Sequence, residues 1–419
     1  MNIVTTLFLI ALGVSLLLQI GLSLRHIRHV RAHRAAVPEA FAERIPLDAH
    51  RKAADYTVTR TRFGLINLAW STVLLLGWTL GGGFAWLDSV LSASLADWSP
   101  VAIGVAVLLA ATVIGSLLDL PFDAWKTFRI EQAFGFNRST PALFLRDLGM
   151  QLLLTLLLGA PLAWAALSLM IGAGEYWWAW VWLLWSGFVL LMLWAFPTVI
   201  APLFNKFTPL ADGALRERIE NLLTRCGFRS DGIFVMDGSR RSAHGNAYFT
   251  GIGNNKRIVF FDTLLDGLDG DEVEAVLAHE LGHFRRQHVR KHLLASLILS
   301  GVGLYVLSLL AEWPAFHQGL GVETGSAHAV LFLFLLVAPL FTVVLHPIAS
   351  MITRKHEFEA DDYAAEHSRA DKLISALVKL YRENASTLTP DPWYSAFHDS
   401  HPPAPVRIAR LSAKLAPST

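Results

Sequence analysis

The chain of 419 residues contains a single cysteine, Cys226. One cysteine cannot form an internal disulfide, and it cannot supply a cysteine-rich zinc site. Charged residues are also scarce, at 16% of the chain, and the net charge is only +1. This balance lacks the strongly basic character of nucleic-acid-binding domains, so we expect no nucleic-acid partner.

Long apolar runs are abundant by contrast. Hydrophobic residues make up 53% of the chain, and its mean hydropathy is +0.44. A helix needs about 20 apolar residues to cross a bilayer. One such run could be a buried core helix, but seven in one chain predict a mainly α-helical, polytopic membrane protein. The seven predicted spans lie near residues 3–24, 63–87, 100–120, 148–172, 176–201, 292–312 and 329–352.

Lysine and arginine are distributed unevenly among the loops between these spans. They cluster at 25–34 and 126–146 but do not occur in 88–99, 173–175 or 313–328. Because basic loops stay on the cytoplasmic side, we predict an outside amino terminus and a cytoplasmic carboxy terminus. The positive charge follows the first apolar run, so that run is expected to be an anchor rather than a cleaved signal peptide.

The most specific motif is His279-Glu280-Leu281-Gly282-His283, an HExxH sequence. Histidines four residues apart lie within about 40° of each other around a helix, so both can bind one ion. Acidic residues from Asp271 onward favour a helix beginning there. Zinc bound by such histidines lowers the pKa of its water to about 7, and the glutamate then acts as general base. The motif predicts a metallopeptidase with Glu280 as its base.

A third protein ligand is needed, and His288 and His292 follow closely in sequence. On a continuous helix they would point about 180° and 140° away from His279, so we interpret them as non-ligands. The acidic run at 357–362 offers a carboxylate from another helix. Glu357 is the expected ligand, and Asp361 is expected to orient a histidine through its other ring nitrogen.

The residues outside the spans are expected to form one α+β peptidase domain, because the segments 202–291 and 354–419 together have the size of a domain. We therefore predict a membrane region with five spans at 1–201. The peptidase domain would cover 202–419, interrupted by the spans near 292–312 and 329–352.

Within this domain the pattern predicts a helix at 214–226, a strand at 232–236 and a β-hairpin with strands at 246–250 and 257–261 around a turn at 253–255. Peptides can bind as an added strand at a sheet edge. Asn246 and Ala247 are therefore candidate substrate-binding residues, and an ordinary hairpin is the equally weighted alternative.

Near the carboxy terminus, His401 precedes two prolines, and Arg407 follows six residues later. These side chains suit stabilisation of the oxyanion in amide hydrolysis or binding of a substrate carboxylate. A structural turn is the alternative interpretation.

Together these features resemble the type I CAAX prenyl protease family, integral-membrane zinc metalloendopeptidases with seven spans. The resemblance covers nearly the whole length. The matching segments are 128–131 with 135–137, 202–210, 246–249, 256–259, 261–265, the HExxH helix, Arg354 with 357–361, and 400–403. Departures occur at Gly245, Thr353 and Asp399, none of which replaces a catalytic group.

The resemblance implies a function and a role for each candidate residue. Eukaryotic members remove the last three residues of prenylated CAAX proteins, so the expected partners are a peptide or protein substrate, possibly prenylated, and membrane lipids. The roles implied are one zinc ion bound by His279, His283 and Glu357, catalysis by Glu280 with help from His401 and Arg407, and substrate binding at Asn246 and Ala247.

Two further functions remain as alternatives. Short loops, many alanines and leucines, and an end at 415–419 without a KDEL-like signal favour a bacterial inner membrane. Bacteria generally lack farnesylated CAAX proteins, so quality control of non-prenylated membrane proteins is one alternative. A non-catalytic zinc-binding transporter or scaffold is the other; three ligands and a retained Glu280 disfavour it, because structural zinc sites normally have four protein ligands.

Overall fold

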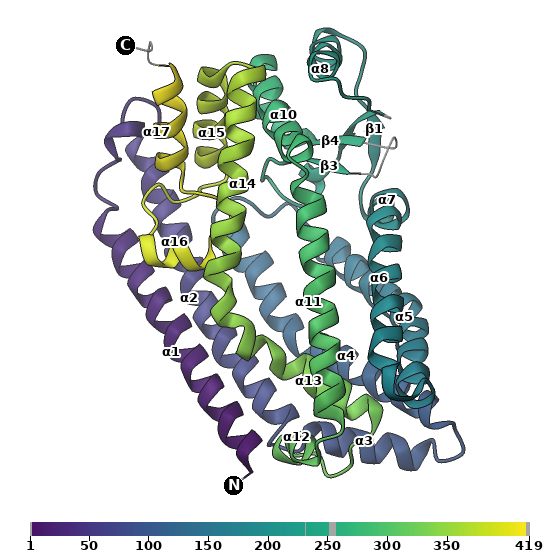
Figure 1. Cartoon of the computed structure of the whole chain (residues 1–419). Coiled ribbons are helices and arrows are strands. Elements are labelled where there is room, and N and C mark those ends of the chain that lie inside the picture. The colour runs from purple at the N-terminus through teal and green to yellow at the C-terminus, as the bar shows by residue number, and fades with distance from the viewer. Residues whose placement is uncertain (1, 231, 251–256, 416–419) are drawn as a thin grey trace.

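Long helices that run between the two ends of the molecule dominate the fold (Figure 1). The computed structural model describes residues 2–230, 232–250 and 257–415. The helices α3 and α12 lie at one end, and the strands with α8, α10, α15 and α17 lie at the other. The chain is therefore divided into a helical region and a mixed α/β region stacked upon it.

Six helical segments are long and apolar enough to cross a membrane, and the bent pair of α2 and α3 raises the number to seven. The expected mainly helical membrane fold is confirmed, with seven spans when the bent pair is counted as one span. The straight segments are α1 (Ile3–Ala32), α4 (Pro100–Trp125) with η2 (Lys126–Glu131), α5 (Pro141–Gly172), α6 (Trp177–Ala195) with η4 (Phe196–Ile200) and α7 (Ala201–Phe204), α11 (His288–Ala311), and α13 (Ala327–Thr342) with η6 (Val343–Leu345) and α14 (His346–His367).

The predicted span at 63–87 is wrong as a single helix. The structure has α2 (Leu47–Trp78) and α3 (Gly83–Ser94), bent by 49° at a short break. Gly82 in the break has a φ of +73°, a left-handed conformation that suits glycine. A Cβ added to Gly83 would lie 2.7 Å from the carbonyl oxygen of Gly77, so the turn also requires a close backbone approach. An apolar run does not reveal such a helix end.

The predicted span at 329–352 also ends too early. The helices α13 and α14, joined by the single 3-10 turn η6, form one helical segment from Ala327 to His367. Glu357 therefore lies on a continuation of the last span rather than after it.

The spanning helices expose most of their apolar surface. In the most apolar stretch of α5 only 11% of residues are buried, and in α6 and α11 only 6%. Large apolar side chains such as Leu191, Trp194, Ile298 and Leu299 are exposed there. Soluble proteins rarely leave such continuous apolar surfaces open, so these helices face lipid.

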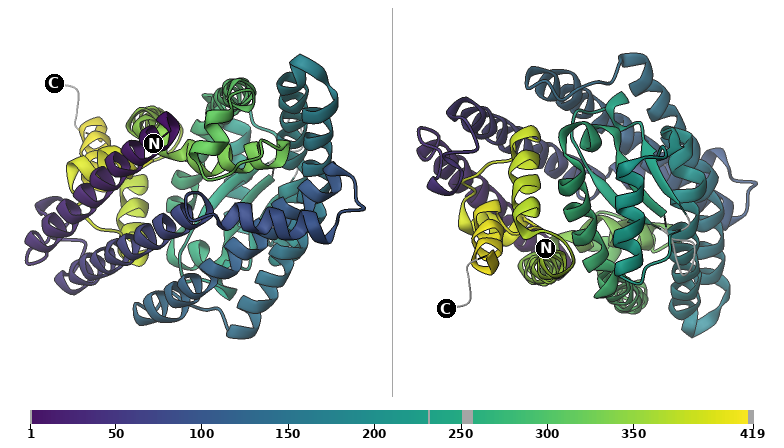
Figure 2. Two further views of the ribbon diagram at one scale, coloured as in Figure 1. Left: turned by 90° about the horizontal axis from the view of Figure 1, so that it is seen from below. Right: turned by 90° about the horizontal axis from the view of Figure 1, so that it is seen from above.

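Viewed along its long axis, the molecule has the spanning helices around its periphery (Figure 2). The purple helices α1 and α2 lie at one side, next to the yellow carboxy-terminal segment, and α5 and α6 lie at the opposite side. Arg25 of α1 donates to the buried carboxylate of Asp391, and this bond fastens α1 to the start of α16 (Pro392–His398).

The second region contains a four-stranded sheet with the order β1-β2-β4-β3. Its strands are β1 (Phe207–Pro209), β2 (Ile233–Met236), β3 (Ala247–Thr250) and β4 (Arg257–Phe261). The strands β3 and β4 are antiparallel, so the predicted hairpin is confirmed, and β3 lies at the edge of the sheet. The predicted turn of this hairpin at 253–255 lies outside the described residues. The predicted strand at 232–236 is confirmed as β2. The pairing of β2 with β4 is parallel, and neither it nor β1 was predicted.

The helices α8, α9, α10, α15 and α17 pack beside this sheet and share one apolar core with it. The predicted helix at 214–226 is confirmed as α8, and Phe41 and Ile45 from the loop after α1 join the same core. The remaining elements are η1 (Glu39–Phe41), η3 (Gly174–Tyr176), α8 (Ala214–Arg225), η5 (Gly238–Arg240), α9 (Asp262–Gly267), α10 (Gly270–Arg285), α12 (Pro314–Gly319), α15 (Ala370–Glu383) and α17 (Ala404–Leu415).

Candidate metal centre and active site

The HExxH motif lies on α10, whose start is fixed by its sequence. Asp269 caps the helix by accepting from the backbone N–H of Glu272, and the side chain of Glu272 accepts from the backbone N–H of Asp269. This reciprocal capping box satisfies two backbone donors at the helix start. The helix begins at Gly270, one residue before the predicted position, and carries His279 and His283 on one face.

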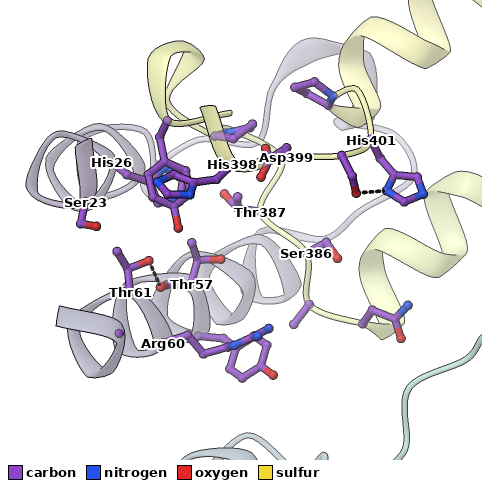
Figure 3. Close-up of a pocket in the computed structure, with 18 of the residues that line it drawn as sticks. Ser23, His26, Thr57, Arg60, Thr61, Ser386, Thr387, His398, Asp399 and His401 are labelled. Atoms are coloured by element: carbon purple, nitrogen blue, oxygen red, sulfur yellow. Dashed lines mark hydrogen bonds between the residues drawn. The ribbon is translucent and has the colours of Figure 1, made fainter. Parts of the chain in front are cut away.

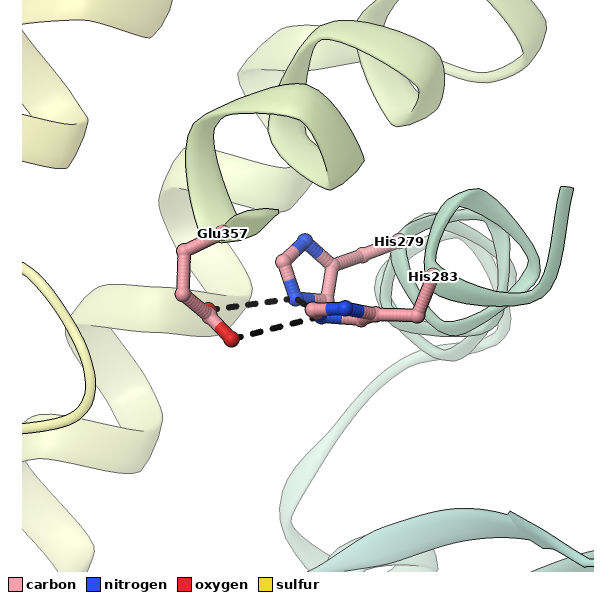
Figure 4. A group of neighbouring side chains, drawn as sticks. All are labelled: His279, His283 and Glu357. Carbon is pink, nitrogen blue, oxygen red and sulfur yellow. Dashed lines mark hydrogen bonds and ion pairs between the residues drawn. The ribbon is translucent and has the colours of Figure 1, made fainter. Parts of the chain in front are cut away.

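The helix α14 packs closely against α10 and brings Glu357 to the two histidines. The helices approach closely at Gly282, where an added Cβ would lie 2.8 Å from the Cα of Ala360. Figure 4 shows His279 and His283 pointing from α10 toward Glu357 on α14. Two elements that are distant in sequence therefore form one cluster.

The donor atoms of this cluster have the separations of a tetrahedral metal site. His279 Nε2 lies 3.2 Å from His283 Nε2, and the two carboxylate oxygens of Glu357 lie 3.5 and 3.3 Å from these nitrogens. Zinc bonds of about 2.0–2.2 Å at tetrahedral angles place neighbouring donors about 3.3–3.6 Å apart. Among the residues that the structure describes, no other group of three such ligands converges.

Two further observations fit a cation at this point. The buried Oε2 of Glu357 has no hydrogen-bond partner among the described residues. Burial works to lower the pKa of His279, but the neighbouring carboxylates of Asp361 and Glu357 outweigh burial and raise the pKa to about 9. The carboxylates around His279 thus favour positive charge at this point, which a bound cation would supply.

Asp361 and Arg407 support the cluster from behind. Asp361 Oδ1 lies 2.9 Å from His279 Nδ1, the nitrogen that faces away from the cluster centre. Arg407 donates from Nε and Nη2 to both oxygens of Asp361, at 2.9 and 2.6 Å, and its Nη1 lies 3.5 Å from Glu357. Arg407 is buried, so only its surface toward a small adjoining cavity remains for the predicted contact with substrate.

That small cavity, of about 120 Å³, brings the predicted base and the sheet edge together. Its lining includes Glu280, Asn246 and Ala247, together with His279. Burial raises the pKa of the Glu280 carboxyl, which suits a group that must accept a proton near neutral pH. Ala247 starts β3, which among the described strands pairs only with β4 and leaves its other edge unpaired.

His401 completes the group. Its Nε2 lies 3.3 Å from Glu357 Oε1, and its Nδ1 lies 2.9 Å from the hydroxyl of Ser400. The side chain is 63% exposed; it lines the 120 Å³ cavity and two larger cavities described below. The structure thus brings every candidate residue from the sequence into one site.

Comparison with known proteins identifies the family. Residues 26–206 match the family described as CAAX prenyl protease N-terminal, five membrane helices, and residues 209–415 match peptidase family M48. A CAAX prenyl protease 1 homolog from Oryza sativa subsp. japonica is 34% identical over 397 residues, covering 91% of this chain and 92% of the relative. The chain belongs to the M48 CAAX prenyl protease family. It is accordingly a multi-pass membrane metalloendopeptidase that acts on a peptide or protein substrate.

Other relatives agree over a similar length. CAAX prenyl protease 1 from Saccharomyces cerevisiae is 32% identical over 405 residues, covering 90% of this chain and 88% of the relative. The crystal structure of S. mikatae Ste24p superposes with a TM-score of 0.88 at 30% identity, covering 96% of this chain and 98% of that one. These relatives are eukaryotic, so they lend no support to the predicted bacterial source.

A larger cavity of about 340 Å³ lies on the His283 side of the cluster. Its walls combine Glu280 and His401 with apolar and aromatic side chains of β3, α10 and the two spans α6 and α11: Leu193, Tyr248, Phe249, Phe284 and Val289. None of these five was predicted as a site residue. Only the hairpin pattern hinted at Tyr248 and Phe249, because they adjoin Ala247 on the edge strand.

The third cavity, of about 580 Å³, extends from His401 toward α1 and α2 (Figure 3). Polar side chains from these helices and from the segment after α15 face one another across it, including Thr57, Arg60 and Ser386. Asp399 also lines it, and burial raises the pKa of that carboxyl.

His288 was rejected as a ligand on the assumption of a continuous helix, and that assumption is wrong. The helix α10 ends at Arg285, and Gln287 has a left-handed φ of 59° before α11 begins at His288. The helix is interrupted there, and the ring of His288 contacts that of His283. His288 is not one of the three grouped ligands, but its position next to them was not predicted from the sequence.

Proposed function

We propose that this metalloendopeptidase uses zinc and removes the C-terminal tripeptide of prenylated CAAX proteins. The observation that carries the proposal is the convergence of His279, His283 and Glu357 at tetrahedral separations. The names of the relatives point to the CAAX substrate.

The metal would be held by His279 Nε2, His283 Nε2 and the carboxylate of Glu357. Zinc in such a site polarises a water molecule, lowering its pKa to about 7, and acts as a Lewis acid toward the scissile carbonyl. Three protein ligands leave a fourth position for water or substrate, as in catalytic rather than structural zinc sites. This donor set disfavours a purely structural role in a transporter or scaffold.

Each side chain of the site then has a separate role. Glu280 removes the proton from the attacking water and delivers it to the leaving amine. His401, exposed beside Glu357, donates a hydrogen bond to the carbonyl oxygen as negative charge develops there. Arg407 holds Asp361, and Asp361 fixes the ring of His279. The free edge of β3 at Asn246 and Ala247 binds the substrate backbone as an added strand.

The 340 Å³ cavity supports a prenylated substrate. It adjoins His283 and is walled by Leu193 and Val289 from two lipid-facing spans, together with aromatic side chains. An isoprenoid chain on the substrate cysteine could enter it directly from the membrane. Membrane lipids are accordingly proposed as partners.

We also propose the sidedness and the domain division expected from the sequence. The two basic loops contact the peptidase region: Phe41 belongs to its core, and the N–H of Arg138 donates to the carbonyl of Arg241. Basic loops mark the cytoplasmic side. The membrane region 1–201 and the peptidase domain 202–419 would then place the catalytic group in the cytoplasm and the amino terminus outside. The proposed membrane is a bacterial inner membrane, on composition alone.

A pair of peptides tests the substrate. The purified protein in detergent is given a farnesylated CAAX peptide and the same peptide without the lipid. We expect release of the tripeptide from the farnesylated peptide, with a much higher KM for the unmodified one. Efficient cleavage of unmodified or unfolded membrane proteins, with no preference for the lipid, would replace this proposal with the quality-control function.

A further inference from the structure

His288 occupies a position between three helices next to the metal cluster. It is the first residue of α11, directly after Gln287, whose left-handed conformation separates α11 from α10. Its Nδ1 lies 3.0 Å from Nδ1 of His283. The His288 side chain is almost fully buried, and both rings line the 340 Å³ cavity.

The other edge of the same ring faces α14. His288 Nε2 lies 3.0 Å from Oε2 of Glu359, and the ring stacks on His356 with centroids 4.0 Å apart. His288 therefore connects a histidine of the HExxH motif on α10 with a carboxylate on α14.

The ring protons of His283 and His288 have one arrangement that satisfies both contacts with each imidazole neutral. If Nε2 of His283 binds a metal, its Nδ1 must carry the proton. That N–H can donate only if Nδ1 of His288 is unprotonated, and the proton of His288 then lies on Nε2, where it donates to Glu359. Both contacts are satisfied at once.

The two metal-binding histidines would then be held in parallel ways. Asp361 contacts Nδ1 of His279 directly, at 2.9 Å. Glu359, two residues earlier on the same helix, reaches Nδ1 of His283 through His288. A hydrogen-bonded partner at the rear nitrogen fixes the tautomer and ring orientation of a metal-binding histidine.

We propose that His288 is a positioning residue that, together with Glu359, fixes the tautomer and orientation of His283 for metal binding. This inference rests on the proposed function, because it takes Nε2 of His283 as a ligand. The proposal also gives the span α11 a role. Because α11 begins at His288, the position of this helix affects the orientation of His283.

Zinc affinity tests the proposal independently of catalysis. The full chain is purified in detergent, stripped of metal and titrated with zinc against a chelator. His288→Ala should weaken zinc binding by about 10- to 100-fold, the usual loss when such a partner is removed. His292→Ala is the matched control: it removes an imidazole one turn further along α11 that contacts His356 but not His283. It should leave the affinity unchanged.

Two further variants separate positioning from packing. His288→Asn leaves an oxygen acceptor near the position of Nδ1 and should recover most of the affinity. Glu359→Gln retains an acceptor for His288 and should stay near wild type, whereas Glu359→Ala should lose affinity. Because the residues act as a chain, the double variant His288→Ala/Glu359→Ala should bind zinc no more weakly than His288→Ala alone.

The outcomes distinguish this inference from the proposed function. Unchanged affinity in His288→Ala, or an equal loss in His292→Ala, overturns the role of His288 while zinc binding by wild type stands. If wild type binds no zinc, both proposals fail together. If His288→Ala does not fold, as judged by thermal unfolding of the metal-free protein, the comparison of Glu359→Ala with Glu359→Gln decides the question.

Discussion

At the scale of single residues, the site depends on buried charges that compensate one another. Asp361 is fully buried, and Arg407 and Glu357 are 6% and 5% exposed. Removing one partner of such a group leaves an uncompensated buried charge, at a cost of about 3–5 kcal/mol. The stability of the site and its metal-binding geometry are therefore linked.

Asp361→Asn tests this link. The amide oxygen can still accept from His279, but the guanidinium of Arg407 loses its bidentate carboxylate. We expect zinc affinity to fall by about 10- to 100-fold and the apparent melting temperature to drop. Chelator titration and thermal unfolding measure the two effects. Asp362→Asn, at a more exposed position that pairs with Arg410, is the control and should change neither strongly. Wild-type affinity in Asp361→Asn would contradict the role of this carboxylate.

Spacing along a helix made several of these residues predictable. The pair His279 and His283, and the pair Glu357 and Asp361, each repeat after four residues, so each pair shares a helix face. The rear contact of Asp361 with His279 follows from that geometry. The bond between Arg407 and Asp361 joins residues 46 positions apart, and no local pattern indicates it. His288 was missed because the helix end at Arg285 carries no glycine or proline.

At the scale of elements, the contact between α10 and α14 sets the distance between the ligands. The two helices are in close contact at Gly282, and a Cβ there would meet Ala360 at 2.8 Å and Tyr363 at 3.1 Å. The glycine of the HExxH motif therefore has a packing role in addition to its place between the ligands.

Gly282→Ala should force α10 and α14 apart. Overpacking of this kind usually costs about 1–3 kcal/mol, although alanine favours the helix itself. We expect weaker zinc binding and a lower melting temperature. Gly301→Ala on α11 is a control within the spans: its added Cβ would lie 3.1 Å from the ring of Trp182, far from the ligands, and zinc affinity should be retained. Tight zinc binding by Gly282→Ala would show that the helices can adjust.

Element boundaries were harder to predict than element types. Apolar runs located the spans, but the break after Trp78 and the continuation of α13 into α14 depend on backbone packing that hydropathy does not measure. The hairpin pattern predicted the pairing of β3 with β4, whereas the edge position of β3 depends on the pairing of β4 with β2. The parallel pairing of β2 with β4 joins residues distant in sequence, such as Ile233 and Ile258. The alternation of apolar residues within each strand does not predict which strands pair.

At the scale of the whole molecule, we propose that the two ends lie on opposite sides of a membrane. The helix α8 lies at the end with the peptidase core, and α3 lies at the other end (Figure 1). The chain has one cysteine, so Cys226→Ser gives a cysteine-free background.

In that background, Glu217→Cys on α8 and Ala96→Cys after α3 introduce exposed thiols at the two ends. A membrane-impermeant maleimide applied to intact cells should label Ala96→Cys but not Glu217→Cys. After the membrane is permeabilised, both should react. Labelling of Glu217→Cys in intact cells would reverse the proposed orientation.

The central claim is that Glu280 performs catalysis beside a metal that it does not bind. The most direct measurement compares wild type with Glu280→Ala, for zinc content and for cleavage of a farnesylated CAAX peptide. We predict one zinc ion per chain in both proteins, with cleavage lost by at least about 100-fold in the variant, as for removal of a general base. A variant that cleaves at the wild-type rate, or wild type without zinc, would contradict the account.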